Sequence, residues 1–170
     1  MTDPHASRRA LLLAPLLAAL PDLIGSAAAS PLNPVQTIVR LPDTLQWHSS
    51  KGAPPNSVDM CPLVGDTDGT GLYYTLVRWW PGYMSAPHRY VTDRLCVVVS
   101  GTWWVTSGDD FDPASTVPVK AGSFVRRVAK TSHYDGVKSG EPEPVTIAIC
   151  GIGPIEFTAV DPSKPKVRKV

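Results

Sequence analysis

Two histidines lie in segments of this 170-residue chain whose residue types could do chemistry. His88 is followed two residues later by Tyr90, and His133 belongs to a separate β-like segment. Residues two apart in a β-strand point to the same face, so His88 and Tyr90 can both enter one interior, where His133 could meet them from a facing strand. Imidazoles with oxygen ligands suit Zn, Fe, Mn, Ni or Cu. We therefore predict His88, Tyr90 and His133 as metal ligands, with Tyr90 as ligand or general acid.

The nearby Arg94 opposes a metal at this place. A guanidinium keeps its proton and has no lone pair, so Arg94 cannot be a ligand. Within a few ångströms of a divalent ion it would be repelled by several kcal/mol at an effective dielectric constant of about 20. Arg94 must point away, pair with a carboxylate such as Asp93, or bind an anion.

These properties define a second interpretation, a metal-free pocket. Here Arg94 holds the carboxylate or phosphate of a small ligand through a two-pronged contact, with the two histidines and Tyr90 as polar contacts. An inward carboxylate such as Asp93 or Asp135 beside the histidines would favour the metal. An inward Arg94 with no carboxylate would favour the anion.

Tryptophan and arginine pairs occur in several predicted strands, at 79–80 and 103–104 for tryptophan and 126–127 for arginine. Adjacent strand residues face opposite ways, so one tryptophan of each pair should line the interior and the other an outer face. Trp103 is predicted to contact a ligand. One arginine could reach the pocket mouth, although a solvated position is expected for both.

The elements that must position these residues are strands. Turn residues recur every eight to twelve positions, and no long stretch has apolar residues at helical spacing, which favours an all-β sandwich or barrel. Residues 35–45 should form a strand or two, and residues 49–58 a loop. Further strands are predicted at residues 72–80, 95–99, 102–106, 123–128, 133–137, 145–150 and 155–160. Hairpin turns are expected at residues 81–82, 100–101 and 107–110.

This arrangement resembles the cupin family. The first cupin motif reads Gly, five residues, His-x-His, three or four residues, Glu, six residues, Gly, and the chain has at these positions Gly82, His88, Tyr90, Arg94 and Gly101. The second motif is matched by Gly122 and His133, with Val128 and Lys130 at its proline and second glycine. Tyr90 and Arg94 thus stand at two ligand positions.

The resemblance covers about residues 46–162 and implies an all-β, single-domain cupin jelly-roll barrel with a small-molecule pocket. It also implies metal-dependent oxygenase, isomerase or lyase chemistry on a small organic acid or sugar. The alternatives are non-catalytic binding of an anion by Arg94 and the pocket histidines, and a structural dimeric barrel without an active site.

An export signal is predicted at residues 1–29, followed by the barrel domain at 30–170. Arg8 and Arg9 precede an apolar stretch over residues 10–20, and three alanines at 27–29 precede Ser30. The paired arginines resemble a twin-arginine signal; an ordinary secretory leader is the alternative. We expect a periplasmic or secreted protein without a membrane anchor, because the apolar stretch is too short to span a bilayer.

The net charge bears on the partners that we expect, and the cysteine content bears on disulfide bonds. The formal net charge is only +1, so no nucleic-acid partner is expected. Cys61, Cys96 and Cys150 cannot all pair within one molecule, which leaves room for one disulfide; Cys96 and Cys150 are predicted as core residues. A homodimer is expected from the Trp-rich strands.

Overall fold

The computed structural model describes residues 32–33 and 35–170. The chain divides into two compact units, Met1–Leu41 and Pro42–Val170, and the barrel is the second. The predicted leader lies outside the described residues, so export stays a prediction. None of the helices in the described part is long and apolar enough to cross a membrane.

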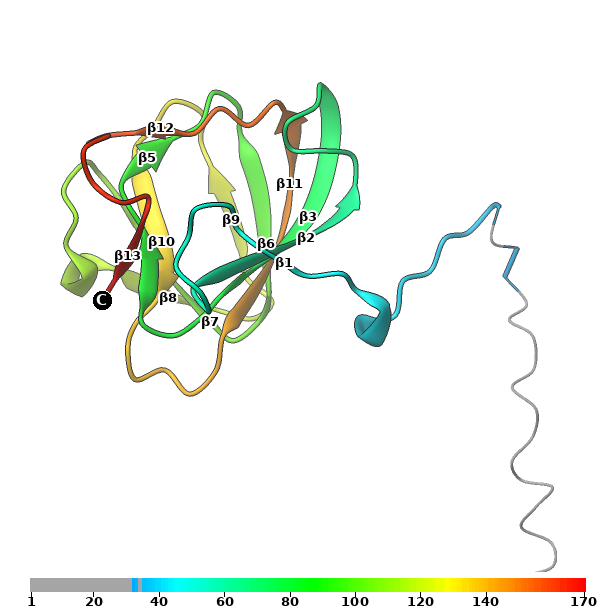
Figure 1. The fold of residues 1–170 in the computed structure, drawn as a ribbon, viewed down its shortest axis with the longest axis horizontal. Coiled ribbons are helices and arrows are strands. Elements are labelled where there is room, and N and C mark those ends of the chain that lie inside the picture. Colours follow the sequence, from blue (N-terminus) through cyan, green and yellow to red (C-terminus); the bar gives the residue numbers. More distant parts are fainter. Residues whose placement is uncertain (1–31, 34) are drawn as a thin grey trace, which may run out of the picture. The chain divides into compact units, whose positions relative to one another are not determined.

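Two antiparallel sheets form the barrel (Figure 1). The first contains, in spatial order, β1 (His48–Ser49), β2 (Val58–Val64), β3 (Gly71–Trp79), β11 (Val145–Gly153), β6 (Arg94–Ser100) and β9 (Phe124–Arg127). The second contains β12 (Thr158–Ala159), β5 (His88–Arg89), β10 (His133–Val137), β4 (Tyr83–Ser85) and β13 (Val167–Lys169), with β7 (Thr102–Ser107) beside β10 and β8 (Val117–Lys120) beside β7. The described helices are two short 3-10 turns, η2 (Pro42–Thr44) and η3 (Pro113–Ser115). The all-β, two-sheet prediction is confirmed.

Alternation along the strands fills the space between the sheets. Strand β3 buries every second residue from Tyr73 to Trp79, and β11 buries Val145, Ile147 and Ile149 on the face beside it. Each tryptophan pair splits as predicted. Trp79 and Trp103 are buried, whereas the neighbouring indole of Trp80 donates to Asp59 and that of Trp104 donates to Glu141.

Two predicted hairpins are instead corners at which the chain changes sheet. Strand β3 pairs with β2 and β11 but not with β4, and β6 pairs with β11 and β9 but not with β7. Gly82 and Gly101 make these corners with φ values of 87° and 74°, which favour glycine. At Gly101 a Cβ would also lie 2.6 Å from the Pro144 carbonyl oxygen. Of the three predicted turns, only that at residues 107–110 joins paired strands, β7 and β8.

Other local predictions are corrected. Residues 35–45 contain a 3-10 turn and no strand, because Pro42 begins the turn and has no backbone N–H to donate to a sheet. The strand predicted at 155–160 shortens to Thr158–Ala159. All three cysteines are free, and Cys150 is only partly buried, since it alternates to the outer face of β11.

Strand β10 packs so tightly against β4 that Gly136 is required there. A Cβ at Gly136 would lie 2.2 Å from the Tyr83 carbonyl oxygen and 2.5 Å from Met84 Cα, which are backbone atoms. We expect Gly136→Ala to lower the free energy of unfolding by about 2–3 kcal/mol, as over-packing does, measured by urea denaturation. The matched control is Gly69→Ala, whose Cβ would make only ordinary contacts with Asp66 at 3.5 Å. Equal stabilities of the two variants would contradict this packing.

Candidate functional site

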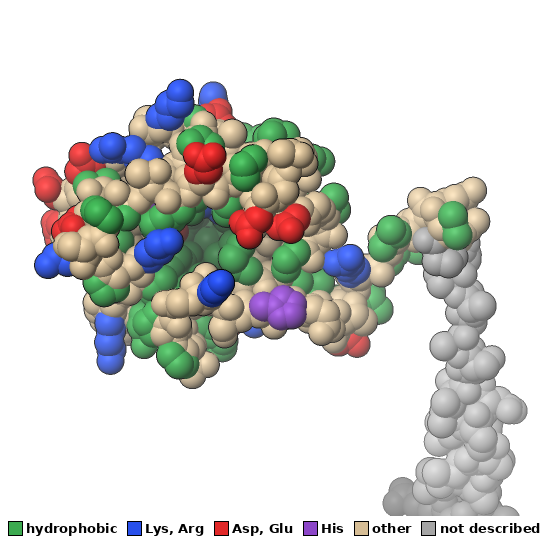
Figure 2. Space-filling model, turned by 45° about the horizontal axis from the view of Figure 1, so that its top comes forward, with side chains coloured by type: hydrophobic (Ala, Val, Ile, Leu, Met, Phe, Trp, Pro, Cys, Tyr) green, Lys and Arg blue, Asp and Glu red, His purple; other side chains and the backbone are tan. Residues whose placement is uncertain are grey.

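A cavity of about 1170 Å³ lies between the two sheets. This volume slightly exceeds the usual range for small-molecule sites, about 300–1,000 Å³. Apolar side chains of the first sheet line one side, and Figure 2 shows the hollow with hydrophobic side chains inside it and basic side chains nearby. The apolar lining residues include Val58, Met60, Val77, Trp79, Ile147, Ile149, Ile155 and Phe157.

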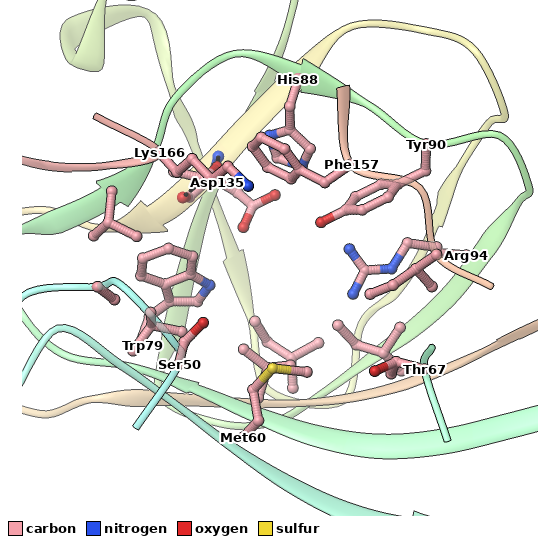
Figure 3. Close-up of a pocket in the computed structure, with 18 of the residues that line it drawn as sticks. Ser50, Met60, Thr67, Trp79, His88, Tyr90, Arg94, Asp135, Phe157 and Lys166 are labelled. Carbon is pink, nitrogen blue, oxygen red and sulfur yellow. Dashed lines mark hydrogen bonds between the residues drawn. The ribbon is translucent and has the colours of Figure 1, made fainter. Parts of the chain in front are cut away.

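Polar side chains line another part of the cavity wall in a row. His88 is in β5, Tyr90 follows it in the connection, and Arg94 begins β6. The ring centroids of His88 and Tyr90 are 4.8 Å apart, and Arg94 Cζ lies 4.3 Å from the Tyr90 ring centroid. Figure 3 shows the Tyr90 hydroxyl and the Arg94 guanidinium pointing into the open space. The row arises because Tyr90 follows His88 by two residues, and the chain then enters β6 with Arg94 at the first buried position of that strand.

The His88 ring is held in one tautomer. Its Nδ1 lies 2.7 Å from the Ala86 carbonyl oxygen and must donate to it, which leaves the lone pair of the neutral ring on Nε2. Burial lowers the pKa of His88 to about 4. The imidazole is therefore neutral at pH 7. Phe157 stacks on this ring with a centroid distance of 4.5 Å.

His133 lies behind His88 and is not among the residues that line the cavity. The two are register partners in β10 and β5, with ring centroids 4.5 Å apart. His133 Nδ1 is 3.1 Å from the Thr131 carbonyl oxygen, whereas Nε2 is buried without a hydrogen-bond partner. Burial, and then the neighbouring His88, lower the pKa of His133 to about 3.

Arg94 is buried with 9% of its surface exposed, and it takes part in no ion pair within the described residues. Its Nε atom has no hydrogen-bond partner. Asp93, the neighbouring carboxylate, is engaged elsewhere, because it accepts from Arg126 Nε at 2.7 Å and from the Ala129 amide at 2.8 Å. The structure therefore excludes two of the three arrangements expected for Arg94: a side chain that points away from the cavity, and an ion pair with Asp93.

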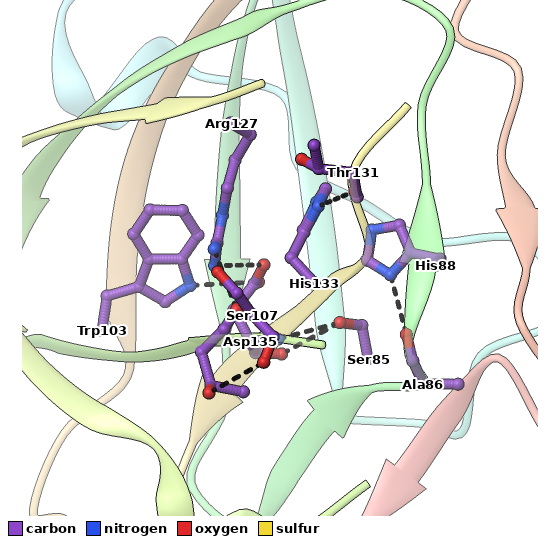
Figure 4. A network of polar contacts seen from close by, with 10 residues as sticks. Ser85, Ala86, His88, Trp103, Ser107, Arg127, Thr131, His133 and Asp135 are labelled. Carbon is purple, nitrogen blue, oxygen red and sulfur yellow. Dashed lines mark hydrogen bonds and ion pairs between the residues drawn. The ribbon is translucent and has the colours of Figure 1, made fainter. Parts of the chain in front are cut away.

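The other inward carboxylate, Asp135, is also occupied (Figure 4). Arg127 Nη2 lies 3.1 Å from Asp135 Oδ2, and the Trp103 indole donates to Oδ1 at 3.0 Å. Burial would raise the pKa of the Asp135 carboxyl, but Arg127, the two histidines and Arg94 together outweigh it and keep the pKa below its usual range. The ion pair and the hydrogen bonds of Asp135 are directed to Arg127 and Trp103, so Arg94 has no ion-pair partner of its own among the described residues.

The donor atoms do not fit a resident metal ion. His88 and His133 could each offer Nε2, but within the described residues no three His, Cys, Asp or Glu side chains form a group able to hold a metal. The nearest carboxylate, Asp135, already binds Arg127, and burial raises the pKa of Tyr90, which keeps its hydroxyl protonated. Position 94 supplies a cation instead of a ligand. The ligand roles predicted for His88, Tyr90 and His133 gain no support from this geometry.

Solved structures with similar backbones identify the fold. The polyketide cyclase RemF from Streptomyces resistomycificus aligns with a TM-score of 0.61 at 13% identity, over 76% of this chain and 90% of that chain. A cupin-2 domain protein from Rhodospirillum rubrum aligns with a TM-score of 0.54 at 16% identity, over 78% and 86%. The barrel has the cupin fold.

A third structural neighbour, KdgF from Halomonas sp., aligns with a TM-score of 0.50 at 16% identity, over 66% of this chain and 91% of that chain. No family model matches the sequence, and no curated protein matches it. Identities this low carry the fold and not the reaction. The predicted cupin fold is confirmed, and the chemistry must be argued from the residues of this cavity.

The structure brings together most of the predicted site. His88, Tyr90, Arg94 and Trp103 line the cupin cavity, with His133 against the first two. The lining residues that the sequence did not single out include Met60, Arg127, Phe157 and Lys166. Strand alternation predicted that one arginine of the pair at 126–127 could face the cavity, but it could not show which one. Lys166 directly precedes β13, and no local signal in the sequence shows that this strand pairs with β4 in the barrel.

The two buried histidines should make stability depend on pH. Their folded pKa values, about 4 and about 3, lie below the unfolded value near 6.5, so the unfolded chain binds more protons as the pH falls from about 6.5. Stability is unaffected above that pH and declines below it by about 1.4 kcal/mol per pH unit for each histidine. We expect His133→Gln to lose about 2 kcal/mol less than wild type between pH 6.5 and 5 in urea denaturation. The exposed-site control His48→Gln should lose as much as wild type; a parallel decline in all three proteins would refute the assignment.

Metal content separates the two sequence interpretations. We expect the purified full chain, supplemented with Zn, Fe, Mn, Ni or Cu and then dialysed, to retain far less than one ion per chain by plasma mass spectrometry, because a third ligand is missing. A His88→Ala, His133→Ala variant should give the same trace content. Near-stoichiometric metal in wild type that disappears in this variant would show that the cavity is a metal centre.

Proposed function

We propose that the protein binds a small organic anion inside the cupin barrel, with the carboxylate of the ligand on Arg94. The observation that carries this proposal is the buried, inward guanidinium without a counter-ion. Both carboxylates near it are used by other arginines, Asp93 by Arg126 and Asp135 by Arg127. A planar guanidinium matches a carboxylate in a two-pronged contact, and Arg94 Nε is buried without a hydrogen-bond partner.

Energetics support an anionic partner. A buried charge without a partner costs several kcal/mol. The contact of Arg94 with the Tyr90 ring, at 4.3 Å, contributes about 1–2 kcal/mol at most. A bound carboxylate would remove the remaining deficit, and the low dielectric of the cavity would strengthen the attraction.

The remaining walls describe the rest of the ligand. Aromatic and aliphatic side chains from β2, β3 and β11 face the polar row, so the body of the ligand should be apolar or aromatic. Tyr90 offers a hydroxyl donor and His88 an Nε2 acceptor, so one or two polar groups beside the carboxylate could be recognised. Lys166, whose Nζ lies 4.9 Å from the Phe157 ring centroid, adds positive charge.

The other functions expected from the sequence have less support. Metal-dependent oxygenase, isomerase or lyase chemistry lacks a suitable ligand set, and a purely structural barrel does not account for an inward Arg94 facing a large cavity. We further propose that binding takes place after export, in the periplasm or outside the cell, because residues 1–29 carry the pattern of a leader.

Removing the guanidinium should abolish binding of carboxylates. We expect 3-phenylpropionate and phenylpyruvate to quench the fluorescence of Trp79 and Trp103, which line the cavity, and to bind by titration calorimetry. Arg94→Met should raise Kd by 100-fold or more, because it removes a buried charge-assisted hydrogen bond. The amide 3-phenylpropionamide should bind wild type and the variant equally weakly.

The matched control is Arg126→Met, which removes an arginine from the exposed face of β9. Its affinity for both carboxylates should remain within about two-fold of wild type. Carboxylate binding that survives Arg94→Met, or no preference of the wild type for acid over amide, would overturn the proposed function.

A further inference from the structure

We propose that the same cavity catalyses metal-free proton transfer at the carbon next to a carbonyl, acting on a 2-oxo acid with an aromatic or apolar side chain. In this assignment His88 Nε2 is the base and Tyr90 holds the carbonyl oxygen. The inference rests on the proposed function, which puts the carboxylate of the ligand on Arg94.

The order of the polar groups along the wall carries the assignment. Arg94, Tyr90 and His88 follow one another, with 4.3 Å from Arg94 Cζ to the Tyr90 ring and 4.8 Å from there to the His88 ring (Figure 3). A 2-oxo acid presents a carboxylate, a carbonyl and an acidic C–H in the same order. With the carboxylate on Arg94, the carbonyl oxygen lies beside the Tyr90 hydroxyl and C3 lies toward His88. Phe157, stacked on His88, lies beside this end of the row and can contact an aromatic substituent at C3.

The hydrogen-bonding states suit these roles. The bond from His88 Nδ1 to the Ala86 carbonyl fixes a tautomer with a basic lone pair on Nε2. Burial raises the pKa of Tyr90, so the hydroxyl is protonated and can donate. The Arg94 charge beside Tyr90 stabilises negative charge that develops on the carbonyl oxygen. Base, donor and cation are thus fixed before a ligand arrives.

The step balances without a redox partner or a metal. The C3–H bond breaks and its proton forms an N–H bond at His88 Nε2. The electron pair of that bond forms the C2–C3 double bond, and the carbonyl electron pair moves onto oxygen, which accepts the hydrogen bond from Tyr90. Protonation of this enolate oxygen gives the enol, whereas return of a proton to C3 restores the oxo acid.

Free His88 is a weak base because its surroundings are apolar and two guanidinium groups lie nearby, while Asp135 acts in the opposite direction. A bound carboxylate neutralises Arg94 and so removes one of the charges that disfavour an imidazolium. Ligand binding thus raises the basicity of His88 when the substrate is in place.

Deuterium exchange of phenylpyruvate tests the proposal. The full chain is added to phenylpyruvate in D₂O at low buffer concentration, loss of the C3 proton signal is followed by ¹H NMR, and Kd is measured in parallel. We expect wild type to accelerate exchange at least 100-fold over buffer, the scale of general base catalysis. His88→Asn should reduce the acceleration by 100-fold or more with Kd within about five-fold, because asparagine can donate to Ala86 but has no basic nitrogen.

Two further variants keep the result interpretable if His88→Asn folds poorly by near-ultraviolet circular dichroism. Tyr90→Phe removes only the hydroxyl, which interacts with Arg94, and should slow exchange 10-fold or more with Kd within about five-fold of wild type. His48→Gln, an exposed histidine on β1, should exchange at the wild-type rate.

The possible outcomes distinguish proton transfer from carboxylate binding. Arg94-dependent binding of phenylpyruvate with exchange at the buffer rate would overturn proton transfer and leave anion binding intact. Exchange that is unchanged in both His88→Asn and Tyr90→Phe would also overturn it. Absence of Arg94-dependent binding would overturn both.

Discussion

The ion pair between Arg127 and Asp135 decides the electrostatics of the whole cavity. Arg94 and Arg127 are register partners on β6 and β9, so both guanidinium groups enter the same interior, where Asp135 is the buried carboxylate. Arg127 takes that carboxylate, with Trp103 completing its hydrogen bonds. Arg94 keeps a net positive charge as a consequence. The positive charge of the cavity depends on the pairing of Asp135 with Arg127 and not with Arg94.

Burial favours the uncharged forms of the two histidines and of Tyr90. The histidines stay neutral because their surroundings are apolar and cationic, and Tyr90 keeps its proton. The wall therefore presents one fixed cation, one hydroxyl donor and one imidazole acceptor. The alternating side chains of β2, β3 and β11 add apolar surface to the cavity. The cavity thus combines a polar row with an apolar lining, and this combination supports the proposal of an amphipathic anion as the ligand.

The fold could be predicted from the sequence because strand alternation and turn residues are local signals. Strand β10 was predicted at its observed bounds, and the same alternation put His88 and Tyr90 on one face. Local signals could not show where the chain changes sheet, since Gly82 and Gly101 look the same at a hairpin and at a corner. Nor could they select Arg127 over Arg126, because that choice depends on Asp135 from another strand. Phe157 and Lys166 reach the cavity only through the return of the last strands to the barrel.

Position 94 shows how one inward residue can change the charge of a cavity without changing its backbone geometry. Alternation along β6 makes this position inward whatever its charge, as the buried and exposed residues of that strand show. Where the cupin motif has a glutamate, an inward carboxylate can join histidines around a metal. Arginine at the same place faces the same cavity with the opposite charge, which repels a cation and attracts an anion. Asp135 pairs with the second guanidinium, so position 94 carries a charge opposite to that of the motif while the barrel keeps the cupin fold, and this inversion of charge is the basis on which we propose an anion in place of a metal.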